Sequence, residues 1–212
     1  MDFLSQDLNS YVQRHTGSAS ELLNRIERET HLHVLMPRMI SGHLQGRVLS
    51  MLMKMIQPEF ILEIGTYTGY SALCMAEGLA ANGKLVTIDK NEELEDRVKG
   101  YFEASVYQSQ IDFVVGNAME IVPSLDYPWD VVFLDADKAN YLNYYQMVFD
   151  QVRPGGYIIA DNVLWSGKVL DEKELDEDTE ALKLFNKEVQ ADTRVENVLF
   201  PLRDGIMIVR KC

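Results

Sequence analysis

A regular alternation of short apolar runs with helical segments, between residues 60 and 161, most constrains how this chain can fold. The apolar runs lie at residues 60–64, 84–89, 111–115, 129–135 and 156–161. Runs of this length, bounded by polar and turn-forming residues, are typical of strands that are buried on both faces. Strands that alternate with helices form a parallel sheet, so the sequence predicts a doubly wound, Rossmann-like α/β fold.

The segment before this pattern is predicted to be helical. Residues 2–15, 19–34 and 41–56 carry apolar side chains at helical spacing. Ser18, three residues before Glu21, resembles the start of a capping box for the second of these helices. In the third helix we expect the core-facing side chains to be Leu44, Val48, Leu52, Met55 and Ile56.

The segment after the pattern completes the predicted fold. Residues 195–201 and 205–209 form two strand-like runs with a short link, which predicts a closing antiparallel hairpin. The 212 residues contain no linker, repeat or low-complexity tract. We therefore expect a single domain over residues 1–212, with helices at 1–57 and the sheet core at 58–212.

Charge and cysteine content narrow the class of protein. The net charge of −13 disfavours broad contact with phosphate backbones, because such contact relies on lysine and arginine. Two cysteines give no disulfide framework, and no segment looks like a leader or a membrane span, so we expect a cytoplasmic protein. The acidic residues 171–180 lack the glycine and ligand spacing of a calcium loop, which indicates a solvated loop and helix start.

Polar side chains follow two of the predicted strands at the point where each strand ends. Asp135, Asp137 and Lys138 follow one strand, and Asp161 and Asn162 follow the next. In open α/β sheets ligands bind beyond the carboxyl ends of the strands, and oxygen donors suit Mg²⁺, with Mn²⁺ or Ca²⁺ as alternatives. The pattern predicts a divalent-metal site beside a basic amine, although each strand end alone is also typical of a helix cap or a turn.

A glycine-bearing turn follows the first strand and opens a helix. It runs from Glu63 to Ser71, and its glycines allow a ligand to approach the backbone, although the spacing departs from G-x-G-x-x-G. The next strand ends in Asp89, whose carboxylate can accept hydrogen bonds from ribose hydroxyls. Asn117 and Ala118 form a further turn that can present backbone groups to a base, or Asn117 can simply cap a helix. Together these features predict an adenosine-containing cofactor; a tight turn with a strand-end cap is the alternative.

The motifs together resemble the cation-dependent O-methyltransferases, the family of caffeoyl-CoA and catechol O-methyltransferases. The specific part of the resemblance is Leu-Asp-Ala-Asp-Lys at 134–138 followed by Ala-Asp-Asn-Val-Leu-Trp-Ser-Gly at 160–167, and the terminal Asp204-Gly205 is a looser match. The resemblance covers about residues 38–210. It implies a bacterial-type member with S-adenosylmethionine as cofactor, a seven-stranded sheet with an antiparallel last strand, and a homodimer.

The resemblance also implies roles for particular residues. Asp135, Asp161 and Asn162 match the metal ligands of the family, and Lys138 matches its catalytic base. Asp135 is also expected to take part in catalysis, next to Lys138. Trp165 could wall an aromatic substrate or simply cap the sheet, and Asp137 could orient Lys138 or a bound water. The residues that match the cofactor site are Met39, Ser41, Glu63, Gly65, Tyr67, Tyr70, Ser71, Asp89, Ala118 and Asp135.

The chemistry of these residue types indicates the substrate class. Three protein oxygens leave about three positions in an octahedral shell, which suits two neighbouring hydroxyls and a water. The expected activity is therefore O-methylation of a small phenolic vicinal diol, with Lys138 as base if the nearby cation lowers its pKa. Alternatives are 5-hydroxyuridine in transfer RNA or a hydroxycinnamoyl-CoA ester, and, from other classes, a nicotinamide-dependent oxidoreductase or a non-catalytic cofactor-binding protein.

Overall fold

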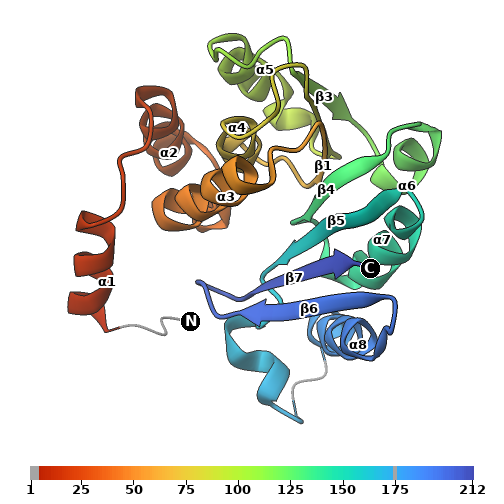
Figure 1. Ribbon diagram of the computed structural model, residues 1–212. Coiled ribbons are helices and arrows are strands. Elements are labelled where there is room, and N and C mark those ends of the chain that lie inside the picture. The colour runs from red at the N-terminus through yellow and green to blue at the C-terminus, as the bar shows by residue number, and fades with distance from the viewer. Residues whose placement is uncertain (1–4, 174–175) are drawn as a thin grey trace. The chain divides into compact units, whose positions relative to one another are not determined.

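Seven strands form one sheet in the computed structural model, which describes residues 5–173 and 176–212. Their order across the sheet is β3-β2-β1-β4-β5-β7-β6, and β7 runs antiparallel to both of its neighbours (Figure 1). This order confirms the predicted α/β fold with an antiparallel last strand. The strands are β1 (Phe60–Ile64), β2 (Lys84–Asp89), β3 (Ile111–Val115), β4 (Trp129–Leu134), β5 (Val152–Asp161), β6 (Val195–Phe200) and β7 (Ile206–Lys211).

The helices between the strands lie where the sequence predicts them, and the N-terminal helical extension is present. No helix within the described ranges has both the length and the apolar character that a membrane crossing needs. The α-helices are α1 (Gln6–Arg14), α2 (Glu21–His33), α3 (Gly42–Ile56), α4 (Tyr70–Ala76), α5 (Glu95–Glu103), α6 (Ala118–Ile121), α7 (Tyr141–Phe149) and α8 (Glu177–Ala191).

The described residues cluster into two compact units. The first contains Phe60–Gly65 and Asn117–Cys212, and the second contains the described residues up to Glu59 together with Thr66–Gly116. The single-domain organisation stays a prediction. Each unit carries candidate functional residues of its own.

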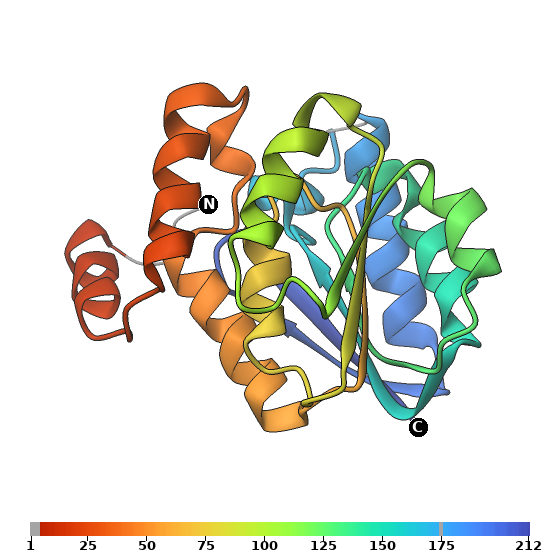
Figure 2. The same cartoon turned by 90° about the horizontal axis from the view of Figure 1, so that it is seen from above.

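The first unit is built on the buried strand β4. All six residues of β4 are buried, and the strand pairs in parallel with β1 on one side and β5 on the other. The helices α7 and α8 pack side by side against one face of this part of the sheet (Figure 2). Tyr141 of α7 meets Phe185 of α8 edge to face, with ring centroids 5.6 Å apart. Aromatic contacts of this kind stabilise the position of α7 next to the carboxyl end of β4.

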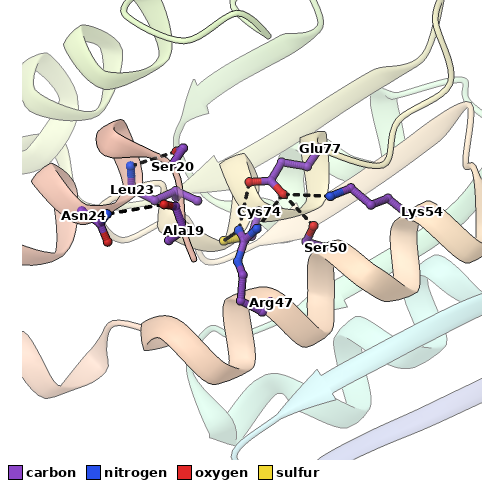
Figure 3. A network of polar contacts seen from close by, with 9 residues as sticks. All are labelled: Ala19, Ser20, Leu23, Asn24, Arg47, Ser50, Lys54, Cys74 and Glu77. Atoms are coloured by element: carbon purple, nitrogen blue, oxygen red, sulfur yellow. Dashed lines mark hydrogen bonds and ion pairs between the residues drawn. The ribbon is translucent and has the colours of Figure 1, made fainter. Parts of the chain in front are cut away.

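The second unit is organised by the packing of α3 on α4. Gly46 of α3 lets the two helices approach closely, because a Cβ atom there would lie 2.7 Å from the Tyr70 ring and 2.8 Å from Cys74 Sγ. The next residue, Arg47, forms a two-pronged ion pair with Glu77 (Figure 3). The contact therefore combines close backbone packing with a polar network.

This packing contradicts the predicted inner side of α3. Met55 is 75% exposed, and Leu44, Val48, Leu52 and Ile56 are only partly buried. Gly46 lies on the buried side because α4 approaches closely there, and Ser50 lies on it with its hydroxyl donating to Glu77 at 2.6 Å. The side chains that α3 buries are Gln45, Gly46, Leu49, Ser50 and Met53.

The start of α2 also differs from the prediction. The residue that caps the helix is Ser20, whose Oγ accepts a hydrogen bond from the N–H of Leu23 at 3.3 Å. The predicted cap, Ser18, lies two residues outside the helix. At the start of α8, Asp176 accepts a hydrogen bond from the N–H of Thr179, so the second half of the acidic segment is a helix start as predicted. Residues 174 and 175 of that segment lie outside the described residues.

Candidate active site

The carboxyl end of β4 carries the first predicted ligand and the predicted base. Asp135 follows the strand directly, and its N–H donates to the carbonyl of Ile64 at 2.9 Å, which holds it at the edge of the sheet. Lys138 begins the short 3₁₀-helix η4 (Lys138–Asn140) and is only 7% exposed. Its Nζ donates to Asp135 Oδ1 at 3.1 Å and to the hydroxyl of Tyr141 at 2.6 Å. A buried amine thus lies against a carboxylate, as the spacing of three residues allows.

The carboxyl end of β5 carries the other two predicted ligands. Leu134 and Ala160 are partners in the β4–β5 register, so the residues that follow them, Asp135 and Asp161, end neighbouring strands at one edge. Asp161 is 2% exposed and its Oδ1 accepts the N–H of Asn162 at 2.7 Å. Asn162 has a left-handed backbone with φ of 60°, which turns the chain sharply after the strand.

The donors at this edge fit a hard divalent cation. Asp135 and Asp161 offer carboxylate oxygens and Asn162 offers an amide oxygen, which are the donor types that Mg²⁺, Mn²⁺ and Ca²⁺ prefer. In the part of the chain that the structure describes, no group of three or more His, Cys, Asp or Glu side chains is arranged to hold a metal. The predicted set contains only two such residues and an amide, so its assignment stays a prediction.

The loop after β5 is held by hydrogen bonds to the turn before β7. Its backbone N–H groups at Val163 and Leu164 donate to the carbonyls of Gly205 and Asp204 at 3.1 and 2.9 Å. Gly205 has a φ of +85°, and a Cβ atom there would lie 2.5 Å from the side chain of Leu164. The loop carries Trp165, whose ring centroid lies 5.9 Å from Lys138 Nζ. The Asp204-Gly205 motif therefore has a structural role beside the candidate base.

The carboxylate of Asp137 is held by residues that follow it in the chain. It accepts hydrogen bonds from the hydroxyl of Tyr144 at 2.7 Å and from the side-chain amide of Asn140. Burial and this hydrogen bond raise the pKa of Tyr144, so that its hydroxyl stays protonated as a donor. These contacts shape the turn that contains Lys138, whereas direct orientation of Lys138 by Asp137 stays a prediction.

The first unit also contains part of the predicted cofactor site. Glu63 is fully buried in β1. Gly65 has a φ of +101°, and a Cβ atom there would lie 2.0 Å from the carbonyl oxygen of Asp135. The glycine thus allows the cofactor turn to lie against the backbone of the candidate metal ligand. Ala118 is buried at the start of α6, and Asn117 caps that helix through the N–H of Met119 at 3.1 Å, which confirms its role as a helix cap.

In the second unit, Asp89 organises the glycine-bearing turn. Its Oδ2 accepts the N–H groups of Thr66 and Tyr67 at 3.0 and 2.7 Å, and its Oδ1 accepts the N–H of Asn91 at 2.9 Å. A carboxylate accepts about four hydrogen bonds, so about one position on Oδ1 is left for a ribose hydroxyl. The strand-end cap is therefore observed, and it leaves room for the predicted ribose contact.

The second unit also brings two separate stretches of the predicted cofactor site together. The hydroxyl of Tyr67 donates to the carbonyls of Leu35 and Met36 at 3.0 and 3.3 Å. This contact fixes the segment that leads to Met39, which is 56% exposed, and to Ser41, which is buried. The N-terminal segment and the glycine-bearing turn are thus neighbours, as the predicted site requires.

Tyr70 and Ser71 lie in the first turn of α4 and are both buried. The Tyr70 ring packs against Gly46, and within the described residues its hydroxyl has no hydrogen-bond partner. Burial raises the pKa of this hydroxyl, so it stays protonated. The surroundings of Tyr70 are those of a core residue, and its contact with a cofactor stays a prediction.

Sequence reasoning missed one residue of the candidate site, Tyr141. It is fully buried, its hydroxyl accepts the Lys138 hydrogen bond, and it donates to the carbonyl of Asp161 at 2.9 Å. Burial and the neighbouring carboxylates raise its pKa well above 10, so it stays a donor. Its position three residues after Lys138, at helical spacing, was the signal that could have found it.

Known proteins resemble this chain in sequence. The family model for O-methyltransferases matches residues 13–212. A catechol O-methyltransferase from Niastella koreensis is 34% identical in an alignment of 171 residues, and the match covers 79% of this chain and 77% of that protein. A caffeoyl-CoA O-methyltransferase from Stellaria longipes is 31% identical in an alignment of 203 residues, and the match covers 91% of this chain and 84% of that protein.

Solved structures agree over nearly the whole chain. The O-methyltransferase TomG from Streptomyces achromogenes, in complex with SAM, has a TM-score of 0.90 and 26% identity, and the match covers 97% of this chain and 96% of that one. An O-methyltransferase from Bacillus cereus in complex with SAH has the same TM-score and identity, with 97% of each chain covered. The chain therefore belongs to the O-methyltransferase family. It is an S-adenosylmethionine-dependent enzyme.

Proposed function

We propose that this enzyme methylates one hydroxyl of a small aromatic vicinal diol in a reaction that requires a divalent cation. The observation that carries the proposal is the position of Lys138. Its Nζ lies 3.1 Å from Asp135 Oδ1, at the sheet edge where Asp161 and Asn162 also lie. A buried base beside a set of oxygen donors suits a substrate that must lose a proton before it reacts.

Asp135, Asp161 and Asn162 would hold the cation, which we propose to be Mg²⁺, with Mn²⁺ or Ca²⁺ as substitutes. When bound, the cation favours the deprotonated form of a hydroxyl next to it and lowers the proton affinity of a neighbouring amine. Octahedral coordination by these oxygens leaves about three positions, which suits two adjacent oxygens of an acceptor. That count favours a catechol over a simple phenol.

S-adenosylmethionine would be the methyl donor. When bound, it would supply a methyl group on a sulfonium centre, and transfer of that group to the acceptor oxygen would give a methyl ether and S-adenosylhomocysteine. The proposed cofactor residues are Met39, Ser41, Glu63, Gly65, Tyr67, Tyr70, Ser71, Asp89, Ala118 and Asp135.

The residues of this chain perform the proton transfer. Lys138 accepts the proton of the attacking hydroxyl, which leaves on the oxygen the electron pair that forms the new bond to carbon. The resulting ammonium group remains next to the carboxylate of Asp135 and later gives the proton to water, which restores the free amine. Trp165, near Lys138 on the loop after β5, would contact the aromatic ring of the acceptor.

A hydroxycinnamoyl-CoA ester is the second candidate acceptor, because a caffeoyl-CoA O-methyltransferase aligns with 91% of this chain. A small catechol is favoured, since the net charge of −13 opposes the binding of the CoA phosphates. The same charge disfavours hydroxylated uridine in transfer RNA. We also propose a homodimer, which light scattering of the purified protein would test.

The test is methyl transfer from S-adenosylmethionine to caffeate, to caffeoyl-CoA and to hydroxyuridine-containing transfer RNA, each with Mg²⁺ and with excess EDTA. Asp161→Asn keeps an oxygen that can accept the N–H of Asn162 but removes the charge. We expect this variant to lose at least about 100-fold in metal-dependent turnover while its affinity for S-adenosylhomocysteine, measured by calorimetry, changes less than about threefold.

Asp192→Asn is the matched control, because Asp192 lies in the same unit and forms its hydrogen bonds with Tyr145 and Arg194. We expect this control to keep wild-type turnover. Equal activity with Mg²⁺ and with EDTA, or a fully active Asp161→Asn variant, would contradict the proposed metal requirement. Turnover of caffeoyl-CoA or transfer RNA but not of caffeate would reassign the acceptor.

A further inference from the structure

The amino group of Lys138 has two hydrogen-bond acceptors close to it. Its Nζ lies 3.1 Å from Asp135 Oδ1 and 2.6 Å from the hydroxyl oxygen of Tyr141. Besides its bond to Cε, the amino nitrogen has three further tetrahedral positions. The two acceptors fix two of these positions, so the third position points away from both of them.

The hydrogen of the Tyr141 hydroxyl is engaged elsewhere. It faces the main-chain carbonyl of Asp161 at 2.9 Å, with the carbonyl of Leu134 at 3.2 Å as a second acceptor. Carbonyl oxygens can only accept hydrogen bonds, so they hold the tyrosine as a donor toward the ends of the two strands. The hydroxyl oxygen is then left to accept from Lys138, and it does not occupy the third position of the nitrogen.

The position of Tyr141 makes this arrangement rigid. The side chain is fully buried, and its ring packs edge to face against Phe185, with centroids 5.6 Å apart. It comes from α7, while its two carbonyl partners come from the ends of β4 and β5. The tyrosine therefore joins the turn that carries Lys138 to both strand ends that carry the candidate metal ligands.

We propose that Tyr141 is the positioning residue for the base: its hydroxyl, oriented by the carbonyls of Asp161 and Leu134, holds the Lys138 nitrogen beside Asp135 so that its third position can meet the substrate hydroxyl. This inference rests on the proposed role of Lys138 as proton acceptor. Tyr141 itself touches neither substrate nor cofactor in this proposal, and it acts only through Lys138. The proton goes from the substrate oxygen to Nζ, and the tyrosine keeps its own hydrogen throughout.

The chain provides a matched control on the same helix. Tyr141→Phe removes the hydroxyl and keeps the ring, and Tyr145→Phe does the same four residues later. Tyr145 is also buried, its ring also meets Phe185 edge to face, and its hydroxyl donates to Asp192 at 2.9 Å. Both variants lose a hydroxyl group from α7, but only the Tyr141 hydroxyl is bonded to Lys138.

The first readout needs no substrate, metal or cofactor. Protein labelled with ¹⁵N-lysine is studied by ¹H–¹⁵N correlation at the side-chain amino groups, and the Lys138 signal is assigned by its loss in Lys138→Met. We expect a slowly exchanging Lys138 signal in the wild type and in Tyr145→Phe. In Tyr141→Phe it should shift and exchange with water at least about tenfold faster, because one of two acceptors is gone. An unchanged signal in Tyr141→Phe would overturn the proposal.

The second readout is the split between kcat and KM with a catechol acceptor. We expect Tyr141→Phe to lower kcat by about 10- to 100-fold, part of the contribution of a positioned base, with KM for S-adenosylmethionine and the Mg²⁺ activation constant within about twofold. Tyr145→Phe should keep its kcat within about twofold. Equal kcat values in the two variants, or a rise in the Mg²⁺ constant that accounts for the loss, would refute positioning. A wild-type enzyme without metal-dependent turnover would refute the proposed function instead. The lysine spectra would still test the contact between Tyr141 and Lys138.

Discussion

The ion pair between α3 and Glu77 leads to a stability prediction of definite size. Arg47 donates through Nη1 and Nη2 to the two carboxylate oxygens of Glu77 at 2.8 and 2.9 Å, and the hydroxyl of Ser50 donates to the same carboxylate at 2.6 Å (Figure 3). The side chains of Arg47 and Glu77 are each only 14% exposed. Glu77→Gln removes the charge of this centre and keeps its size.

The expected loss of stability follows from the charged partner that Arg47 loses. The hydrogen bonds to Glu77 raise the pKa of Arg47 in the wild type. Arginine is not deprotonated in proteins even without such a partner, so the guanidinium stays charged in the variant. Its Nε already has no partner within the described ranges. Removal of one member of a fully buried pair costs about 3–5 kcal/mol. Slight exposure and the amide oxygen of the new glutamine reduce this to about 2 kcal/mol, which corresponds to a fall in Tm of about 4–8 °C.

The pH dependence gives an independent check. Burial raises the pKa of Glu77, but the hydrogen bonds from Arg47 and Ser50 outweigh it, so the folded pKa lies below the ordinary value of 4.5. A lowered carboxylate pKa contributes stability that is present above about pH 4.5 and is lost as the pH falls through the folded value. The difference between wild type and Glu77→Gln should therefore be largest near pH 7 and shrink in acid.

Urea unfolding at pH 7 and at pH 3.5, together with thermal unfolding, would measure both effects. Glu95→Gln is the control, because Glu95 pairs with Lys99 on an exposed helix face and should cost about 0.3 kcal/mol. The reasoning would be refuted if the two variants lost the same stability at pH 7. It would also be refuted if the loss in Glu77→Gln were unchanged at low pH.

Further predictions concern the cofactor turn and the far end of α8. Gly65→Ala should abolish turnover and lower Tm by several degrees, because the new methyl group would collide with the carbonyl of Asp135. Calorimetric unfolding and activity assays would measure these effects, and a stable, active variant would contradict the prediction. Asp89→Ala should weaken the binding of S-adenosylhomocysteine at least about tenfold, since the carboxylate orients two N–H groups of the turn. Calorimetry would measure the affinity, and an unchanged affinity would exclude the proposed contact with the ribose. Asp192→Asn should lower the free energy of unfolding by about 1–2 kcal/mol near pH 7 and by less below pH 4, because the hydrogen bond from Arg194 lowers the pKa of Asp192. Urea unfolding would measure this loss, and a loss independent of pH would argue against the prediction.

The strands were predictable wherever apolar runs have clear ends. The bounds of β1, β2 and β3 match the expected ranges, because each run is short and is closed by polar or glycine-rich segments. The start of β5 was placed four residues too late, at residue 156 instead of Val152. The residues between them include Pro154 and Gly155, which indicate a turn in sequence. Gly155 has a φ of +77°, and the register with β4 shifts along this stretch, so the strand begins irregularly.

The candidate site was predictable where it depends on strand ends and not where it depends on packing. Asp135 and Asp161 lie at neighbouring strand ends as expected, because parallel strands place their carboxyl ends at one edge. Tyr141 was missed, because its partners are main-chain carbonyls of β4 and β5 that no sequence pattern reveals. The predicted inner side of α3 was wrong for a similar reason: Gly46 is buried because another helix requires the space.

The sequence by itself determined the order of strands and helices, the family, and the residue types gathered at the sheet edge. These properties follow from local patterns of hydrophobicity and from short motifs, both of which can be recognised along the chain. Only the tertiary structure decided which face of α3 is buried, how many acceptor positions Asp89 retains, and which hydroxyl holds Lys138. Such properties depend on contacts between residues far apart in sequence, such as the hydroxyl of Tyr141 and the carbonyl of Asp161, where close packing and hydrogen-bond satisfaction outweigh local preference.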